Sequence, residues 1–205
     1  MTDNSANNKR IAINTILLYI RMLFTMVISL YTSRVILQVL GADDFGIYNV
    51  VGGVVVLFSF LTNAMTSSTQ RFLNYNFGLK NESKVSHIFN VSILTHFTIF
   101  LLVLLLSETV GLWFVMTQLN IPVGRETATM WVYQMSVVTT LIGIMVIPYR
   151  ASIIAAERMS IFAYVSILEV ALKLVVVLVL SYMSFDNLVM YSILLTLVAL
   201  LNFFI

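Results

Sequence analysis

Six long apolar segments constrain the fold of this chain more than any other feature of its sequence. They lie at about 11–40, 46–71, 86–107, 128–149, 160–182 and 187–205. Most of them reach the roughly 20 apolar residues that an α-helix needs to cross the hydrocarbon core of a bilayer. None shows the alternation of polar and apolar residues that is typical of membrane β-strands. Because a helix satisfies its own backbone hydrogen bonds in lipid, the segments predict transmembrane helices.

The composition agrees with a membrane protein. Of the 205 residues, 60% are hydrophobic and only 10% are charged, whereas soluble domains average about 45–50% apolar and about 25% charged residues. The net charge of +2 is small and dispersed, which argues against a nucleic-acid partner, and the absence of cysteine excludes disulfides and thiolate metal sites. We therefore expect an all-α integral membrane protein. It would have a tail over residues 1–10 and one domain of six transmembrane helices over 11–205.

The basic residues predict the orientation of this bundle. Only Arg34 and Arg125 fall at the first and third turns. Seven others lie in the N-terminal tail or at the second and fourth turns: Lys9, Arg10, Arg71, Lys80, Lys84, Arg150 and Arg158. The positive-inside rule then places the N-terminus in the cytoplasm. The final segment stops among apolar residues, and we expect the chain to be the first part of a longer protein.

The stretch TSRVILQVLGADDFGIYNVV, residues 32–51, predicts a short turn outside the membrane. Gly41 suits the positive φ that often ends a helix. Asp43 and Asp44 suit the N-terminus of the next helix, where they would cap free amides and complement the helix dipole. Arg34 lies near the outer end of the first helix, from which a long side chain extends to the lipid headgroups.

This turn also resembles one found in bacterial polysaccharide flippases. Their first two helices are typically joined by an arginine, a Leu-Gly pair, a few polar residues and an aromatic-Gly-x-Tyr motif, as in SRVILQVLGADDFGIYNVV. The chain is similar to this family in three more places, which are Asn14, STQRFLNYNFG and PYRASIIAAERM. The resemblance is to the polysaccharide-transporter branch of the multidrug/oligosaccharidyl-lipid/polysaccharide exporter superfamily. It implies twelve to fourteen helices in two lobes, of which this chain would supply the N-terminal one.

A polar stripe on the first predicted helix contains an arginine inside the apolar segment. Asn14, Arg21, Thr25 and Thr32 fall within about 40° of one another on a helix with 100° per residue. An arginine at the centre of a bilayer costs about 2.5–3.5 kcal/mol on the insertion scale, so such charges usually face a cavity or a partner. We therefore assign Arg21 to an inward polar face, and Arg34, on roughly the opposite side, to the outer rim.

The second predicted helix has a similar stripe. It comprises Ser59, Asn63, Ser67, Gln70 and Asn74, and it ends beside Arg71. Hydroxyl and amide side chains of this kind bond across packed membrane helices. They also line water-filled cavities, and the sequence leaves both interpretations open for Asn63 and Gln70.

Two charged residues lie in the middle of the fifth predicted helix. Glu169 and Lys173 are four residues apart with the acid first, the favourable order for a pair within one helix. Pairing makes their insertion tolerable. The pair is either purely structural or takes part in proton or ion coupling.

Catalytic signatures are missing from the sequence. It has no H-E-x-x-H or P-loop motif, and no nucleophile beside a base. We therefore expect no enzyme activity, no cofactor and no metal site.

The resemblance and the charges together predict a flippase in the bacterial inner membrane. Its substrate and partner would be a lipid-linked oligosaccharide on undecaprenyl pyrophosphate, which two lobes would expose to either side in turn. Cationic groups suit the diphosphate. The predicted substrate-binding residues are Arg21 for phosphate, Asn63 and Gln70 for sugar hydroxyls, and Arg34 and Arg71. Two alternatives remain open: a cation-coupled multidrug exporter of the same superfamily, and a membrane scaffold that transports nothing.

Overall fold

The computed structural model describes the backbone of residues 2–57, 60–183 and 185–205, and the side chains of these residues except 2–8, 10, 11 and 60–65. Regular structure in this part of the chain is entirely helical. The elements are α1 (Thr2–Leu57), α2 (Phe60–Gly78), α3 (Glu82–Leu106), the π-helix η1 (Ser107–Gly111), α4 (Leu112–Gln118), α5 (Glu126–Ala155), α6 (Met159–Leu180) and α7 (Asn187–Phe204). Within these residues, five helical stretches are long and apolar enough to cross a membrane. The chain is therefore an all-α membrane protein.

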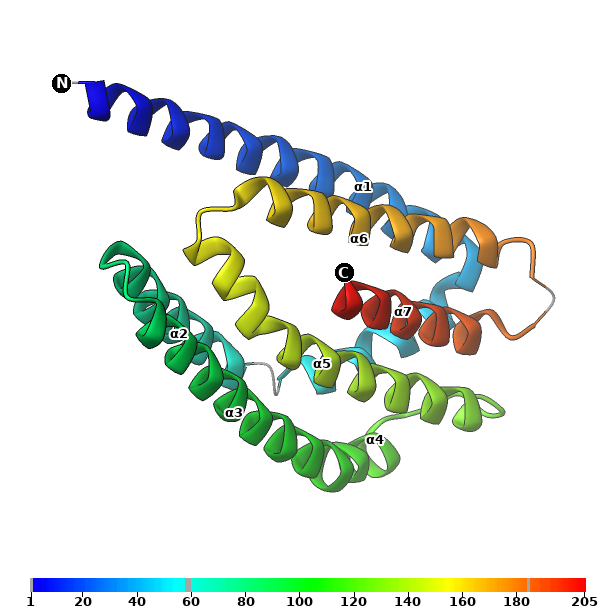
Figure 1. The fold of residues 1–205 in the computed structure, drawn as a ribbon. Coiled ribbons are helices and arrows are strands. Elements are labelled where there is room, and N and C mark those ends of the chain that lie inside the picture. The colour runs from blue at the N-terminus through cyan, green and yellow to red at the C-terminus, as the bar shows by residue number, and fades with distance from the viewer. Residues whose placement is uncertain (1, 58–59, 184) are drawn as a thin grey trace.

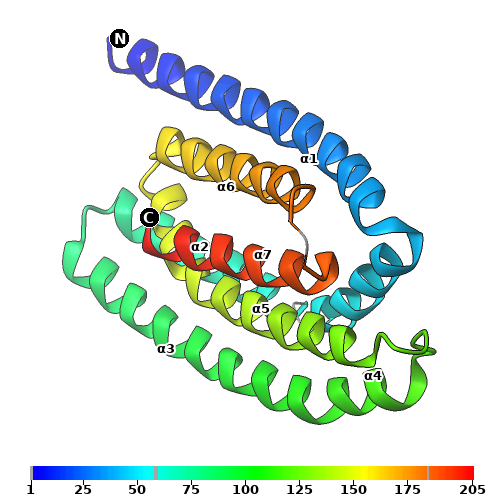
Figure 2. The ribbon, with the colours of Figure 1, turned by 90° about the vertical axis from the view of Figure 1, so that its right-hand side faces the viewer.

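The long helix α1 is divided by a sharp kink at Gly41, where φ is 79° and ψ is 173°. The chain reverses direction there, as Figures 1 and 2 show. We call residues 2–40 the first arm of α1 and residues 42–57 its second arm. The turn thus lies where the sequence predicts it. The expected helix over 46–71 is divided between the second arm and α2.

Gly41→Ala is expected to lower the free energy of unfolding by about 1–3 kcal/mol, because an L-residue is strained at this φ and ψ. A Cβ atom at Gly41 would meet no other atom within 4 Å, so the loss comes from the backbone conformation alone. Gly46→Ala is the matched control, since Gly46 has the same open surroundings without a positive φ. Chemical unfolding in detergent measures both variants. An equal loss in the two would contradict the role of the kink.

The helices form a bundle in which α5 occupies the centre. The first arm of α1 packs along α6, and α7 packs against both α5 and α6 (Figures 1 and 2). On the other side, α2 and α3 pack against α5. Val132, Tyr133 and Val137 of α5 are almost completely buried and anchor the largest apolar cluster. A second cluster joins α6 and α7 around Val177 and Leu180.

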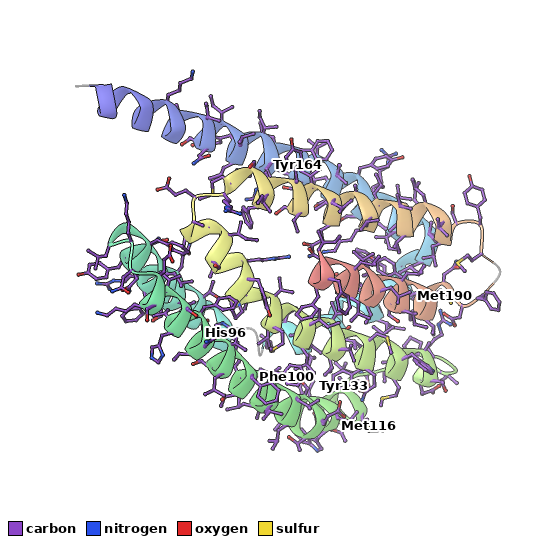
Figure 3. All side chains as sticks on the ribbon, viewed as in Figure 1. His96, Phe100, Met116, Tyr133, Tyr164 and Met190 are labelled. Carbon is purple, nitrogen blue, oxygen red and sulfur yellow. The ribbon has the colours of Figure 1, made fainter. Side chains whose placement is uncertain are left out.

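The second of the five stretches is longer than the expected segment 86–107. It continues through η1 and α4, so that one helical stretch runs from Glu82 to Gln118. Tyr133 donates a hydrogen bond of 2.5 Å to the carbonyl oxygen of Ser107. Its side chain lies between α3 and α5, near Phe100 (Figure 3). Gln134 donates a hydrogen bond of 3.3 Å to the carboxylate of Glu108, which gives this charged residue a polar partner on α5.

Three turns at one end of the bundle meet at Arg125. Its Nε donates to Asp44 Oδ1 at 2.8 Å, and its terminal nitrogens form ion pairs with Asp44 and Asp186. Asp186 also caps α7, because its Oδ1 accepts hydrogen bonds from the backbone amides of Leu188 and Val189. The sequence predicts a capping role for Asp44, whereas in the structure its carboxylate forms an ion pair with Arg125. This contact fixes the second arm of α1 to the starts of α5 and α7.

Candidate functional site

A carboxylate in the middle of α6 gathers donors from three helices. Glu169 is the eleventh of the 22 residues of α6. Its Oε1 accepts a hydrogen bond of 2.8 Å from Lys173 Nζ, one turn further along the same helix. Its Oε2 accepts from Arg150 Nη2 of α5 and from Asn202 Nδ2 of α7, each at 2.9 Å. The sequence predicts the contact with Lys173, and the structure adds the other two.

This cluster explains how α6 carries a charge at mid-membrane. An ionised carboxylate in an apolar environment is unfavourable unless cations and hydrogen bonds compensate it. Lys173 does so from the same face of α6, since residues four apart lie one above the other on a helix. Arg150 lies near the end of α5, and its long side chain reaches back to the carboxylate. Asn202 supplies a neutral donor to the carboxylate from α7.

The cluster forms one wall of a cavity of about 380 Å³, within the usual range of ligand sites, about 300–1,000 Å³. We call it the charged cavity. It lies between both arms of α1 and the helices α5, α6 and α7. Its polar and charged lining consists of Ser29, Thr32, Ser33, Tyr48, Thr139, Arg150, Glu169, Lys173, Tyr191 and Asn202.

The charged cavity has an excess of positive charge. Arg150 and Lys173 contribute two cations, and Glu169 one carboxylate, which leaves one net positive charge among the lining residues. The side chain of Glu169 is 23% exposed, whereas those of Arg150 and Lys173 are 42% and 43% exposed. The cations are therefore more accessible than the acid. Such a wall suits an anionic ligand.

A second cavity, of about 350 Å³, adjoins the first and has a different lining. We call it the hydroxyl chamber. It lies between the second arm of α1, α5 and α7, and its lining residues are Tyr48, Asn49, Gly52, Gly53, Val56, Met135, Ser136, Thr139, Thr140, Ser192 and Leu195. Tyr48, Thr139 and Leu195 line both cavities. The two spaces therefore meet at these three side chains.

The ring of Tyr48 is held in place at this junction. It meets the ring of Tyr191 edge to face, with centroids 4.9 Å apart. Nearby, Thr139 and Thr196 share a hydrogen bond of 3.0 Å between their hydroxyls, which joins α5 to α7. Two of the three side chains at the boundary between the cavities, Tyr48 and Thr139, thus have defined partners.

Arg21, the predicted phosphate contact, lies against α6. Its Nη1 donates to Ser166 Oγ at 3.3 Å, and its guanidinium carbon lies 4.6 Å from the ring centroid of Phe162. Its Nε is buried without a hydrogen-bond partner among the described residues. Arg21 is absent from the linings of the charged cavity and the hydroxyl chamber. Of its predicted stripe, Thr32 lines the charged cavity.

The other predicted binding residues are placed as follows. Arg34 and Arg71 are exposed and Gln70 is half-buried, and none of the three lines either cavity. The side chain of Asn63 lies outside the described residues. The predicted residues that meet at the site are thus Glu169 and Lys173.

A buried polar chain joins α2 to α3 away from the two cavities. His96 is completely buried on α3, and its Nδ1 lies 2.8 Å from the carbonyl oxygen of Ser92 (Figure 3). The hydroxyl of Ser92 in turn lies 3.2 Å from that of Thr69 on α2. This is the kind of contact by which polar side chains hold membrane helices together.

Several residues that line the two cavities also form a polar stripe in the sequence of α5, in addition to the stripes of the first two predicted helices. On α5, Ser136, Thr139, Thr140 and Gly143 follow at steps of three, one and three residues, which places small and polar residues on one face. The same α5 leads on to Arg150 seven residues later. This stripe predicts a polar face on α5. It does not point to Asn202, which is a single amide near the end of α7.

Among the residues that the structure describes, no three His, Asp or Glu side chains gather as metal ligands would. The chain was also compared with protein-family models, with curated proteins and with solved structures, and none of them matches it.

Proposed function

We propose that this protein is a flippase that moves a prenyl-diphosphate-linked oligosaccharide across the bacterial inner membrane by alternating access. The observation that carries the proposal is the charged cavity, which holds Arg150 and Lys173 against one carboxylate near the middle of α6. A diphosphate needs cationic donors wherever it leaves water. Arginine provides a planar pair of donors for phosphate oxygens, and lysine provides a point charge.

Glu169 has a specific role in this mechanism. Its carboxylate satisfies both cations, at 2.9 Å from Arg150 and 2.8 Å from Lys173. A phosphate group offers the same kind of oxygen acceptor and competes for these donors. Binding therefore exchanges one anion for another, which avoids leaving either cation unpaired in the membrane. Because the two cations belong to α5 and α6, the exchange also alters a contact between these helices.

The predicted binding residues that do not line the charged cavity would contact the substrate on its way to or from that cavity. Arg21 lies eleven residues before Thr32 on the first arm of α1, about 16 Å along the helix at 1.5 Å per residue. In the proposed orientation it contacts phosphate nearer the cytoplasmic face. Arg71, Gln70 and Asn63 remain proposed contacts on the cytoplasmic side, and Arg34 remains one at the outer rim.

The two alternatives fit the charged cavity less well. A cation-coupled exporter needs a carboxylate that is available to a cation, whereas Glu169 already has three donors, two of them charged. A scaffold would be favoured if the polar side chains only held helices together. Two adjoining cavities of about 380 and 350 Å³ leave room for a ligand instead.

The proposal is tested by binding of farnesyl diphosphate to the purified chain in nanodiscs of neutral lipid, with farnesol as the uncharged control. We expect the diphosphate to bind at least about tenfold more tightly, a difference of about 1.4 kcal/mol. Changes in tryptophan fluorescence or isothermal titration give both constants. Equal affinities for the two probes would contradict a cavity built for a diphosphate.

A further inference from the structure

The hydroxyl chamber meets the charged cavity at Tyr48, Thr139 and Leu195. We infer that the hydroxyl chamber binds the first sugar of the lipid-linked substrate, next to a diphosphate in the charged cavity. This inference rests on the proposed function. It assigns recognition of the first sugar to the second arm of α1 and to α5, whereas the sequence points to Asn63 and Gln70.

The chemistry of the chamber wall matches a sugar. A sugar ring presents hydroxyls that both donate and accept hydrogen bonds, and it needs partners with the same dual character. Ser136, Thr140 and Tyr48 supply such hydroxyls, and Asn49 supplies an amide. The Asn49 amide nitrogen donates to the carbonyl oxygen of Phe45 at 2.7 Å, which fixes the orientation of the group. Its carbonyl oxygen remains an acceptor for a ligand.

The two cavities differ in the charge of their lining residues, and therefore in the ligand groups that they suit. The lining of the hydroxyl chamber contains no charged residue, whereas Arg150, Glu169 and Lys173 all line the charged cavity. In a lipid-linked saccharide the first sugar is bonded directly to phosphate. A neutral polar space that touches a cationic one reproduces this order of groups.

The backbone leaves room for a ring beside the second arm of α1. A Cβ atom at Gly53 would meet no other atom within 4 Å, and one at Gly52 would come no closer than 4.0 Å to Ser136 Oγ. The missing side chains of these two glycines therefore contribute to the volume of the chamber. Gly143 of α5 has the same open surroundings, but it lines the charged cavity.

These glycines provide a matched pair of variants. Gly53→Leu fills part of the hydroxyl chamber, and Gly143→Leu fills part of the charged cavity. Both positions are helical without a positive φ, so leucine suits the backbone at each. The double variant Ser136→Ala, Thr140→Val keeps the chamber open and removes two hydroxyls from it. Melting curves in detergent establish that each variant is folded.

Two probes separate the sugar from the diphosphate: farnesyl diphosphate, and farnesyl diphosphate carrying N-acetylglucosamine. We expect the wild-type chain to bind the sugar-bearing probe about tenfold more tightly. Gly53→Leu and the hydroxyl double variant should remove this gain and leave the affinity for farnesyl diphosphate unchanged. Gly143→Leu should weaken binding of both probes. A probe carrying galactose, measured in the same way, covers a different sugar configuration.

The outcomes separate this inference from the proposed function. If the wild-type chain binds none of the probes, the proposed function fails, and the inference fails with it. If farnesyl diphosphate binds but neither sugar adds affinity, the hydroxyl chamber is not a sugar site and the proposed function stands. The same conclusion follows if Gly53→Leu weakens farnesyl diphosphate as much as it weakens the sugar-bearing probes.

Discussion

Glu169→Ala is expected to lower the free energy of unfolding by about 2–3 kcal/mol. The substitution leaves Arg150 and Lys173 without the carboxylate that both contact in the membrane. Breaking a fully buried ion pair from one side costs about 3–5 kcal/mol, and the partial exposure of the two cations lowers that figure here. Unfolding in mixed detergent micelles, followed by circular dichroism, gives the free energy.

Glu108→Ala is the matched control for this prediction. Glu108 also lies within a long apolar helix, but its carboxylate accepts a hydrogen bond from the neutral amide of Gln134. Its removal leaves no cation behind, and we expect a loss of about 0.5–1.5 kcal/mol, the usual contribution of a hydrogen bond. If Glu108→Ala lost as much stability as Glu169→Ala, then the two cations would not be the cause.

Combined variants test the contact that the sequence did not reveal. If Glu169 paired with Lys173 alone, the double variant Glu169→Leu, Lys173→Leu would keep the wild-type free energy of unfolding, because both charges are removed together. The structure predicts that this double variant remains destabilised, because Arg150 then lacks its partner. Adding Arg150→Leu should recover stability, since apolar residues often replace buried ion pairs without loss. Wild-type stability in the double variant would mean that Arg150 contributes nothing to the cluster.

The sequence predicted those features of the fold that depend on local patterns. Long apolar segments predicted helices, and Gly41 predicted the reversal of α1, because its φ of 79° favours a residue without a Cβ atom. The spacing of Glu169 and Lys173 predicted their contact. Each of these follows from residues close together in the chain.

The sequence did not predict features that depend on the meeting of distant helices. Asn202 lies 33 residues from Glu169 and approaches it only because α6 and α7 pack together. Arg150 was assigned to a cytoplasmic turn as one of seven basic residues at that face. Its guanidinium nevertheless reaches Glu169, because an arginine side chain extends well beyond the position of its own backbone. The two cavities also arise from packing, which no single segment specifies.

The second large effect is expected in substrate binding: Arg150→Ala should weaken binding of farnesyl diphosphate about 10–100-fold. A charged hydrogen bond contributes about 1.5–3 kcal/mol, and Arg150 supplies the planar donor group of the charged cavity. The variant remains testable because Glu169 keeps its contact with Lys173 at 2.8 Å. Titration of the purified chain in neutral nanodiscs gives the dissociation constant. Melting curves show whether the fold is intact.

Arg150→Lys and Arg21→Ala decide where the phosphate binds. Lysine at position 150 keeps the charge but loses the paired donors, so Arg150→Lys should lie between wild type and Arg150→Ala. Arg21 contacts Ser166 and Phe162 on α6 and lines neither cavity. Arg21→Ala should therefore change the equilibrium affinity by less than about threefold, while slowing movement of a fluorescent prenyl diphosphate in vesicles if Arg21 serves the path. Wild-type affinity in Arg150→Ala together with a large loss in Arg21→Ala would move the phosphate site to the first arm of α1. The proposed contact between the diphosphate and Arg150 would then be wrong.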